Sequence, residues 1–465
     1  MKTLETYQNL FFVGVGGIGM SALARYFHAS GKNVLGYDKS RTKLTSVLVS
    51  EGIDVVFEDV IDQKITGLTP ENTLVIYTPA IKELGILKHF TDLGFRVLKR
   101  AQVLGMITHD TNSIAVAGTH GKTTTSSLVA HLCREAELPF SAFLGGIAEN
   151  FKSNFLFNGD DISVVEADEY DRSFLQLSPD WAIITSIDAD HLDIYGDTAT
   201  IEKGFRDFAE LVPEDTQLFV RKGIDIGRTA RTYAANEKAD FYSDNIRETG
   251  DKILFDFHDE SGDIYPFEWE IPGIHNVENA TAAIALLHTF GVNYETLQRG
   301  ISGFKGIKRR YTKHSFSTGK IYIDDYAHHP TELNAVIGSL KTFYPDKKLL
   351  VVFQPHLFSR TRDFADGFAD SLEKADDLIL LDIYPARELQ KNYEGVTSQW
   401  LSEKIKTENK EVAALEDAFA KIKERNFDIL LTVGAGNIDI LSDGIVEWLA
   451  TESDEKEPSH VNRDK

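Results

Sequence analysis

Residues 113–125 read Ser-Ile-Ala-Val-Ala-Gly-Thr-His-Gly-Lys-Thr-Thr-Thr, an apolar strand that runs into a glycine-bearing loop and a helical stretch. The loop follows the phosphate-binding pattern except at position 116, where the strict pattern has glycine and this chain has Val116. Backbone N–H groups in such a loop face phosphate oxygens, Lys122 can neutralise them, and the Thr123 hydroxyl can bind Mg²⁺. We therefore predict an α/β unit whose phosphate loop (residues 118–124) binds ATP through Gly118, Thr119, His120, Gly121, Lys122, Thr123 and Thr124.

Acidic residues follow two further apolar strands. Glu166 comes directly after the apolar residues Val164 and Val165 and opens a run of four acids in six residues. A second acidic run at 188–193 contains His191. The carboxyl ends of parallel strands are where α/β sheets bind ligands, and Mg²⁺ requires hard oxygen ligands beyond the nucleotide. Such acids can also cap helices or face solvent, and His191 alone can be a structural histidine. The position of Glu166 behind an apolar strand favours the Mg²⁺ site.

A second glycine loop lies near the N-terminus. The N-terminal glycine loop (residues 14–19) has the pattern Gly-x-Gly-x-x-Gly between the apolar strand 9–13 and a helical stretch, and Asp38 ends the next strand. This is the dinucleotide fingerprint, in which the acid meets a ribose hydroxyl. It predicts a nucleotide diphosphate bound by Gly16, Gly17, Ile18, Gly19 and Asp38, although a glycine turn can also serve strand–helix packing alone. A dehydrogenase that uses NAD competes as an interpretation, but hydride transfer has no use for the phosphate loop.

The remaining strands complete an α/β organisation. Apolar runs at residues 75–77, 182–184, 348–353 and 429–433 alternate with helical patterns and indicate parallel sheets. Residues 214–272 differ, and their short apolar runs predict a small antiparallel insertion. We place domain boundaries near residues 108 and 313. The last fifteen residues, from Thr451, are polar and predict a frayed tail.

Composition narrows the class of protein. A length of 465 residues predicts about three domains, and the net charge of −23 argues against broad binding to a nucleic-acid backbone. Cys133 is the only cysteine, so the chain has no internal disulfide, and its place in the helical stretch after the phosphate loop predicts that it is packed. We see no secretory signal and no apolar run of the roughly 18 residues that a membrane span needs, so we expect a cytoplasmic protein without a membrane or nucleic-acid partner.

Several motifs in order along residues 10–440 resemble the Mur ligase family, whose members condense a carboxylate with an amine at the expense of ATP. The motifs lie at residues 14–20, 118–125, 166–169 with 173–174, 190–196, 275–280, 306–310, 324–330 and 353–356. The resemblance implies an α/β fold of three domains: an N-terminal Rossmann-like domain for the UDP moiety (1–108), a central P-loop-type ATPase (109–312) and a C-terminal Rossmann-like domain that closes over both (313–450), before the tail at 451–465.

The resemblance also implies roles by matching position. It assigns catalytic roles to Lys122, Glu166, His191, Arg310 and His328. It also places three residues at the Mg²⁺: Thr123, Glu166 and His191. Asn276 and Asn279 lie by the adenine of ATP, Arg310 reaches the γ-phosphate, and Asp325 reaches the ATP ribose. Tyr326, His328 and Arg360 lie near the incoming amino acid and the muramoyl carboxylate.

The chemistry that the resemblance implies needs no side-chain nucleophile. ATP converts a carboxylate into an acyl phosphate, which the amine then attacks, and the cations Mg²⁺, Lys122 and Arg310 offset the two approaching anions. The implied substrates are UDP-N-acetylmuramate and L-alanine, and we expect a monomer or a homodimer. One alternative is a recycling ligase that attaches an intact tripeptide to the same nucleotide sugar. Another, from a different class, is a non-catalytic nucleotide-binding regulator.

Two positions depart from the family pattern. Leu357 stands where an arginine is common, which removes one expected cation near the substrate carboxylates and leaves Arg360 and Arg362. Ser186 stands where asparagine is more common, and we expect its hydroxyl to keep one hydrogen bond but not two.

Overall fold

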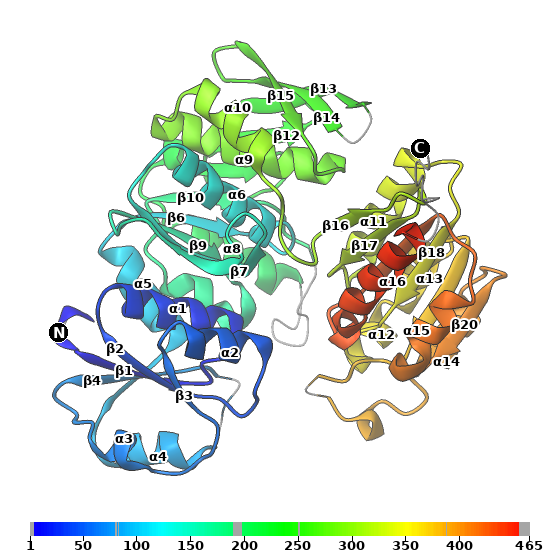
Figure 1. The fold of residues 1–465 in the computed structure, drawn as a ribbon. Coiled ribbons are helices and arrows are strands. Elements are labelled where there is room, and N and C mark those ends of the chain that lie inside the picture. The colour runs from blue at the N-terminus through cyan, green and yellow to red at the C-terminus, as the bar shows by residue number, and fades with distance from the viewer. Residues whose placement is uncertain are drawn as a thin grey trace, which may run out of the picture. The chain divides into compact units, whose positions relative to one another are not determined.

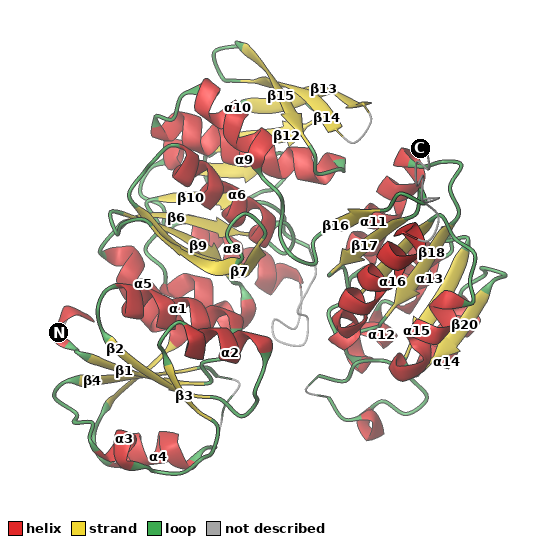
Figure 2. Ribbon diagram, in the orientation of Figure 1, coloured by secondary structure: helices red, strands yellow, loops and turns green. Residues whose placement is uncertain are grey.

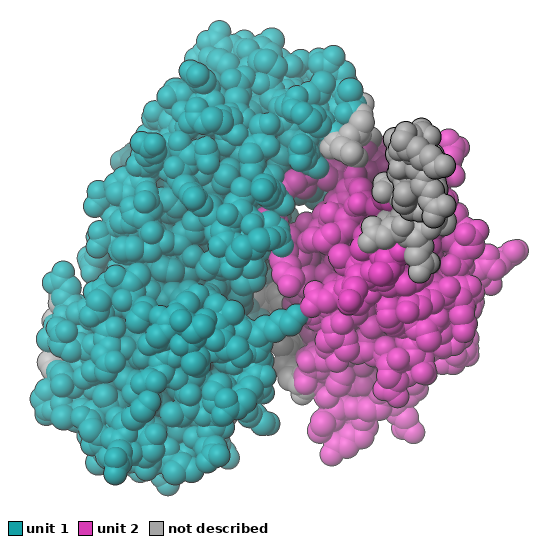
Figure 3. Space-filling view, viewed as in Figure 1, with its two compact units in different colours: residues 1–270, 274–305 teal, residues 271–273, 306–465 magenta. Residues whose placement is uncertain are grey.

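The structure is a computed structural model that describes residues 4–79, 81, 83–188, 198–249, 252–386 and 388–454. It has three α/β domains, each built on its own sheet (Figures 1 and 2), which confirms the predicted fold class. The chain divides into two compact units (Figure 3): a first unit of residues 1–270 and 274–305, and a second unit of residues 271–273 and 306–465. The first two sheets belong to the first unit and the third sheet to the second. The boundaries near residues 108 and 313 stay predictions.

The N-terminal sheet is parallel throughout, in the order β3-β2-β1-β4-β5. Its strands are β1 (Asn9–Val13), β2 (Asn33–Tyr37), β3 (Asp54–Val56), β4 (Thr73–Tyr77) and β5 (Arg96–Lys99). Its helices are η1 (Leu4–Thr6), α1 (Ile18–Ala29), α2 (Lys43–Ser50), α3 (Gln63–Thr66), α4 (Gly85–Asp92) and α5 (Arg100–His109). The strand order reverses beside β1, and the N-terminal glycine loop follows β1 at its carboxyl end, where ligands bind open α/β sheets.

The central sheet has the order β15-β14-β13-β12-β11-β10-β6-β9-β7-β8. Its strands are β6 (Asn112–Ala117), β7 (Phe140–Ala148), β8 (Ser153–Phe157), β9 (Ile162–Ala167), β10 (Trp181–Ile184), β11 (Leu218–Arg221), β12 (Arg231–Ala235), β13 (Phe241–Thr249), β14 (Lys252–His258) and β15 (Ile264–Trp269). Its helices are α6 (Lys122–Glu135), η2 (Tyr170–Gln176), α8 (Thr198–Ala209), η3 (Asp215–Gln217), α9 (Ile274–Phe290) and α10 (Tyr294–Gly303). The buried strand β6 pairs in parallel with β9 and β10, so the loops that follow these three strands meet at one edge.

The predicted antiparallel insertion is smaller than residues 214–272 and is part of the central sheet. Strand β11, whose residues 218–220 were assigned to the insertion, pairs in parallel with β10, and β12 and β13 continue in parallel. Only the pairs β13–β14 and β14–β15 in this segment are antiparallel. The short apolar run at 218–220 carries no mark of strand direction, because direction is set by the connection and not by the residues of the strand.

One apolar core joins the N-terminal and central domains. Helix α1 packs on β7 and β8, and Tyr26 of α1 lies 5.3 Å from Phe143 and 6.3 Å from Phe155 between ring centroids. Arg25 of α1 is also buried; it donates to Asn154 of β8 and pairs with Glu51. The continuous core explains why the two domains form one compact unit.

The third sheet has the order β16-β17-β21-β18-β19-β20, and only the edge pair β16–β17 is antiparallel. Its strands are β16 (Thr312–Ser315), β17 (Ile321–Asp325), β18 (Leu349–Phe353), β19 (Asp377–Leu381), β20 (Lys410–Ala413) and β21 (Ile429–Val433). Its helices are α11 (Pro330–Phe343), α12 (Phe358–Asp363), α13 (Ala365–Leu372), η4 (Gln390–Asn392), α14 (Ser398–Lys404), α15 (Leu415–Lys423), η5 (Asn437–Leu441) and α16 (Ser442–Asp454).

Both faces of this third sheet are buried, because alternate strand residues belong to two separate apolar clusters. The loops after β17, β18 and β21 meet at the carboxyl edge of the sheet. Helix α16 runs to Asp454, so the first residues of the predicted tail are helical, and residues 455–465 lie outside the described residues. Within the part of the chain that is described, no helix has the length and apolar character needed to cross a membrane.

Candidate active site

The phosphate loop connects β6 to α6, and its two glycines are required by geometry. Gly118 has φ +138°, and a Cβ there would lie 2.0 Å from Thr185 Oγ1. Gly121 has φ +82°, caps α6, and would place a Cβ 2.8 Å from Oδ1 of Asn279. Val116, which stands where the strict phosphate-binding pattern has glycine, is fully buried inside β6. The loop is therefore short, begins only at Gly118, and lies against both the end of β10 and helix α9.

Ser186 holds the phosphate loop from the neighbouring strand end. Its Oγ accepts from the backbone N–H of His120 at 2.8 Å and is hydrogen-bonded to Thr119 Oγ1 at 2.9 Å. The backbone N–H of Thr119 donates to the Ser186 carbonyl at 3.1 Å, and Thr119 Oγ1 accepts from Asp188. The expectation that a hydroxyl here keeps one hydrogen bond but not two is therefore wrong. A hydroxyl both donates and accepts, and the Ser186 Oγ has three hydrogen-bond contacts: Thr119 Oγ1, the His120 N–H and, at 3.3 Å, the His120 carbonyl.

The Ser186→Ala variant should weaken nucleotide binding. Removing the hydroxyl leaves the His120 N–H and the Thr119 hydroxyl without this partner in the buried loop, so we expect the KM for ATP to rise about tenfold. Steady-state kinetics with varied ATP measures the effect, and Ser186→Asn should stay within about threefold of the wild type because an amide oxygen can accept from the same N–H. An unchanged KM for ATP in the alanine variant would show that nucleotide binding does not depend on the hydrogen bonds of the Ser186 hydroxyl.

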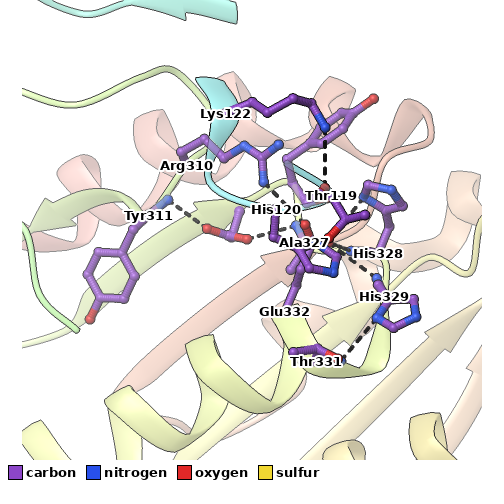
Figure 4. A network of polar contacts seen from close by, with 12 residues as sticks. Thr119, His120, Lys122, Arg310, Tyr311, Ala327, His328, His329, Thr331 and Glu332 are labelled. Carbon is purple, nitrogen blue, oxygen red and sulfur yellow. Dashed lines mark hydrogen bonds and ion pairs between the residues drawn. The ribbon is translucent and has the colours of Figure 1, made fainter. Parts of the chain in front are cut away.

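Lys122, the first residue of α6, is enclosed by the loop and by one acid. Its Nζ donates to the carbonyl oxygens of Gly118 and Thr119 and lies 3.0 and 2.8 Å from the two carboxylate oxygens of Glu169 (Figure 4 shows Lys122 and Thr119). Burial favours the neutral amine, but the carboxylates of Glu169, Glu166 and Asp168 outweigh burial and raise the pKa of Lys122. Lys122 is therefore a cation, as neutralisation of phosphates requires.

Two of the three predicted Mg²⁺ residues, Thr123 and Glu166, lie within the described residues. Thr123 lies in the first turn of α6, and Glu166 lies in β9 opposite Val116 of the neighbouring strand. One Glu166 oxygen accepts from the backbone N–H of Gly145 at 3.1 Å. Hydroxyl and carboxylate oxygens are the hard donors that suit Mg²⁺, so these two residues fit the ion. His191 lies outside the described residues, which contain no cluster of three or more side chains of the types His, Cys, Asp and Glu arranged for a metal ion.

The predicted adenine residues Asn276 and Asn279 lie in the first turns of α9 and are both buried. Contact between α9 and α6 brings Asn279 beside Gly121 of the phosphate loop.

Cys133 is buried in α6, as predicted, and burial raises the pKa of its thiol to about 12, which makes it inert as a nucleophile at neutral pH.

The N-terminal glycine loop owes two of its glycines to contacts inside the chain. Asp38 Oδ2 accepts from the backbone N–H of Gly16 at 2.8 Å, and a Cβ on Gly16 would lie 2.7 Å from that oxygen. Gly19 lies against the Arg100 side chain, where a Cβ would lie 2.8 Å from a guanidinium nitrogen. The same guanidinium lies 3.7 Å from Asp168 of the central domain. Asp38 thus shapes the loop, in addition to any contact with a ribose.

In the second unit, Arg310 lies between two residues with positive φ, Arg309 (+62°) and Tyr311 (+54°). The Arg309 guanidinium donates to the carbonyls of Gly434 and Gly436 in the loop after β21. The Tyr311 N–H donates to Asp325 Oδ2 at 2.7 Å (Figure 4 shows Arg310 and Tyr311). Both neighbours are therefore anchored to the carboxyl edge of the third sheet, and this holds the intervening Arg310 in place.

Asp325 and Glu332 organise the rest of this edge. Asp325 is buried at the end of β17, where its other oxygen accepts from the Ala327 N–H at 2.7 Å, and burial raises its pKa to about 6 against the opposing charge of Arg310. Glu332, in the first turn of α11, accepts from the His328 N–H at 3.0 Å and lies 3.6 Å from Arg310. These two acids bring Arg310 and His328 of the predicted site together (Figure 4).

His328 and Tyr326 lie beside Arg310. The Tyr326 ring centroid lies 5.2 Å from the Arg310 guanidinium carbon and 5.3 Å from the His328 ring centroid. Arg360 of α12 is buried, and its positive charge disfavours protonation of His328. Burial lowers the pKa of His328 to about 4 although Glu332 is close, and Arg360 and Arg310 act in the same direction as burial. His328 is therefore neutral at physiological pH.

The lowered pKa of His328 predicts a stability that falls on acidification. Between pH 6.5 and about 4 the unfolded chain binds a proton at this position and the native chain does not, so the contribution is present above pH 6.5 and lost as the pH falls to 4. We expect the loss to be at most about 3 kcal/mol. Denaturant unfolding at pH 7.5 and pH 5, compared with His328→Gln, isolates this group. Parallel pH dependences in the two proteins would contradict it.

Leu357 at the departure from the family pattern is buried and has φ +68°. Its backbone N–H donates to the Tyr384 carbonyl at 2.9 Å, and its carbonyl accepts from Thr361 in the first turn of α12. Arg360 is buried nearby, whereas Arg362 is half-exposed and paired with Asp363. Of the two arginines that we expected to remain near the substrate carboxylates, Arg360 is therefore the buried one.

Four residues at these sites were not predicted to act there: Arg100, Glu169, Arg309 and Glu332. Glu332 could have been found, because histidine followed by proline and then glutamate at 329–332 is a capping pattern. Glu169 and Arg309 lie inside predicted motifs whose functional roles were assigned to neighbouring residues. Arg100 carries no local signal, because its partners Gly19 and Asp168 lie in two different domains.

Profiles of three domains match the chain in order: Mur ligase family, catalytic domain (residues 9–111), Mur ligase middle domain (116–287) and Mur ligase, glutamate ligase domain (309–436). A curated UDP-N-acetylmuramate–L-alanine ligase of Flavobacterium johnsoniae is 47% identical over 447 residues, 96% of this chain and 99% of that protein. The crystal structure of a UDP-N-acetylmuramate-alanine ligase from Thermotoga maritima aligns with a TM-score of 0.80 at 26% identity, covering 95% of this chain and 98% of that one. A murein peptide ligase from Psychrobacter arcticus shares the fold, with a TM-score of 0.68 at 22% identity and the same coverage.

Proposed function

This chain belongs to the Mur ligase family, and from that premise we propose that it joins L-alanine to the carboxylate of UDP-N-acetylmuramate at the expense of ATP. The observation that carries the proposal is the identity of 47% to a curated alanine ligase over nearly the whole of both chains. The 447 aligned residues are 96% of this chain, so the alignment runs through all three matched domains. The reaction belongs to the synthesis of peptidoglycan precursors.

The first chemical step joins a carboxylate oxygen of the substrate to the γ-phosphorus of ATP, and ADP leaves. Two anions must approach each other, so the site needs cations. Lys122 is charged and lies in the phosphate loop, and Arg310 is held by its anchored neighbours. Mg²⁺, when bound, would neutralise phosphate oxygens, with Thr123 and Glu166 of this chain as donors and His191 as the third residue assigned to it.

The second step is attack by the alanine amine on the acyl carbon; the bond from that carbon to the phosphate oxygen then breaks and inorganic phosphate leaves. Tyr326, His328 and Arg360 are the residues that we assign to the amino acid and the muramoyl carboxylate. His328 is neutral, so its ring can accept a hydrogen bond from the amine, and the buried Arg360 can pair with a carboxylate. Asp325 is assigned to the ribose of ATP, and Asn276 and Asn279 are assigned to its adenine.

The Asp38→Ala variant should weaken binding of the nucleotide sugar and spare ATP. Loss of the carboxylate removes the acceptor of the Gly16 N–H and of the Ser40 N–H, so the N-terminal glycine loop loses its internal support. We expect the KM for UDP-N-acetylmuramate to rise at least about tenfold. Two-substrate kinetics measures it, with Asp38→Asn as the variant that retains an acceptor oxygen. A change confined to the KM for ATP would contradict the assignment of the N-terminal domain to the nucleotide sugar.

Phosphate release in the presence of ATP, Mg²⁺ and UDP-N-acetylmuramate tests the proposed function. L-alanine, glycine, L-serine and the intact tripeptide are supplied in turn as the amine. We expect release that depends on both the nucleotide sugar and L-alanine. Release with the tripeptide but not with L-alanine would support the recycling reaction instead, and no release above background with any amine would support a non-catalytic nucleotide-binding protein. Function in the cytoplasm and a monomeric or homodimeric state remain part of the proposal.

A further inference from the structure

Glu169 makes an enclosed ion pair that the proposed mechanism does not use. Its side chain is 2% exposed, and both of its oxygens lie within 3.0 Å of Lys122 Nζ. It is the fourth residue of the acidic motif that begins at Glu166, and it lies at the start of the 3-10 helix η2. Burial of a carboxylate costs free energy, and the adjacent cation offsets that cost, so each of the two charges stabilises the other.

The three N–H donors of Lys122 all have partners. Two donate to the carbonyl oxygens of Gly118 and Thr119, and the third meets the Glu169 carboxylate. A lysine ammonium group has no fourth donor. Phosphate oxygens can therefore reach Lys122 only by displacing one of these acceptors. The two carbonyls belong to the backbone of the phosphate loop, whereas Glu169 is an anionic side chain like the phosphates themselves.

The neighbouring acids have other contacts. Glu166 accepts from the Gly145 N–H, and Asp168 accepts from the Tyr170 N–H and lies 3.7 Å from Arg100. Glu169 is therefore the acid of this motif whose carboxylate contacts the ammonium group of Lys122. A carboxylate that remained there once the phosphates had arrived would repel them in a water-poor site.

We propose that Glu169 is a positioning residue that holds Lys122 in the nucleotide-free enzyme and yields it to the phosphates of ATP. This role rests on the proposed ATP dependence. It adds that the Glu169 carboxylate competes with the nucleotide phosphates for Lys122. The carboxylate occupies the coordination position of a phosphate oxygen, keeps the lysine inside the loop, and is exchanged when the nucleotide binds. ATP affinity is lowered as a consequence, and so is the affinity of ADP, which assists its release after the reaction.

Nucleotide titration of Glu169→Gln tests the exchange. Isothermal titration calorimetry measures the Kd of AMP, ADP and ATP for the wild type and the variant. An uncharged amide competes less well for Lys122, so we expect the Kd of ADP and ATP to fall about tenfold and that of AMP, which has no β-phosphate, to stay within about twofold. The melting temperature of the nucleotide-free variant should fall by about 3 °C, because the buried lysine loses its counter-ion.

Two further variants separate exchange from a purely structural role. Glu51→Gln removes the negative charge that faces another buried cation, Arg25, at 2.6 Å, and should lower the melting temperature without changing any nucleotide Kd. Glu169→Asp keeps the charge and should bind ADP within about threefold of the wild type. Unchanged or weaker ADP binding by Glu169→Gln, in a wild type that binds ADP, would overturn the proposal and leave the ligase function standing. Failure of the wild type to bind any nucleotide would overturn both.

Discussion

The Lys122→Ala variant is expected to turn over at least about a thousandfold more slowly than the wild type while keeping its fold. Lys122 is a cation within the phosphate loop, and its Nζ donates to the carbonyl oxygens of Gly118 and Thr119. Its charge offsets the negative charge that develops as the substrate carboxylate approaches the γ-phosphate. Because the side chain points into the loop and does not contribute to the apolar core, its removal should leave the secondary structure unchanged.

Phosphate release under saturating substrates measures this loss, with circular dichroism as the test of folding. Lys152→Ala is the matched control: Lys152 is 78% exposed, pairs with Glu149 in the same unit, and should leave the rate within about twofold. If Lys122→Ala retained a rate close to that of the wild type, the lysine would have no part in phosphate transfer. A folded variant that binds ADP but does not turn over would support its role.

The Arg310→Ala variant should lower kcat by about a hundredfold or more, with a smaller effect on the KM for ATP. The structure holds Arg310 between two anchored residues, Arg309 and Tyr311, and beside Glu332. We assign Arg310 to the charge that forms on the γ-phosphate during the reaction, so we expect its loss to lower the rate more than it weakens binding. Arg310→Lys keeps the charge but loses the planar fork, so we expect it to restore only part of the rate.

Arg425→Ala provides the comparison in the second unit. Arg425 is about as exposed as Arg310, with 27% against 33% of the side chain exposed. It pairs with Glu411, and both residues lie about a hundred positions along the chain from Arg310. We expect its loss to leave kcat within about twofold. Equal losses of activity in the two variants would indicate that Arg310 only maintains the fold.

The fold was predictable from sequence wherever a strand is buried on both faces. Residues 10–13, 114–117 and 429–431 are apolar without interruption, and each run lies in a central parallel strand of the structure. The direction of β11 was not predictable, because three apolar residues fit either kind of pairing. The sequence also did not predict that the first two domains form one compact unit. Their shared core depends on side chains of α1, such as Tyr26, which contact β7 and β8 more than a hundred residues later in the chain.

The candidate site was predictable where glycine or charge breaks an apolar pattern, and less so where residues act on one another. Gly118 and Lys122 follow an apolar strand and were identified from that position, whereas Asp325 was assigned through the family resemblance. The several hydrogen bonds of the Ser186 hydroxyl were missed, because they depend on how closely the phosphate loop approaches β10. Glu169 was overlooked for a related reason: its partner Lys122 lies 47 residues earlier in the chain, and only the parallel pairing of β6 with β9 brings the two together.

The central claim is that the chain activates a carboxylate by phosphorylation and passes the acyl group to L-alanine, and oxygen labelling tests it most directly. UDP-N-acetylmuramate with ¹⁸O in both carboxylate oxygens is incubated with the enzyme, ATP, Mg²⁺ and L-alanine, and both products are analysed by mass spectrometry. We predict one labelled oxygen in each inorganic phosphate and one in the new amide, because the oxygen that attacks the γ-phosphorus leaves with the phosphate. Formation of the amide together with unlabelled phosphate, or labelled substrate returned without any amide, would contradict the account.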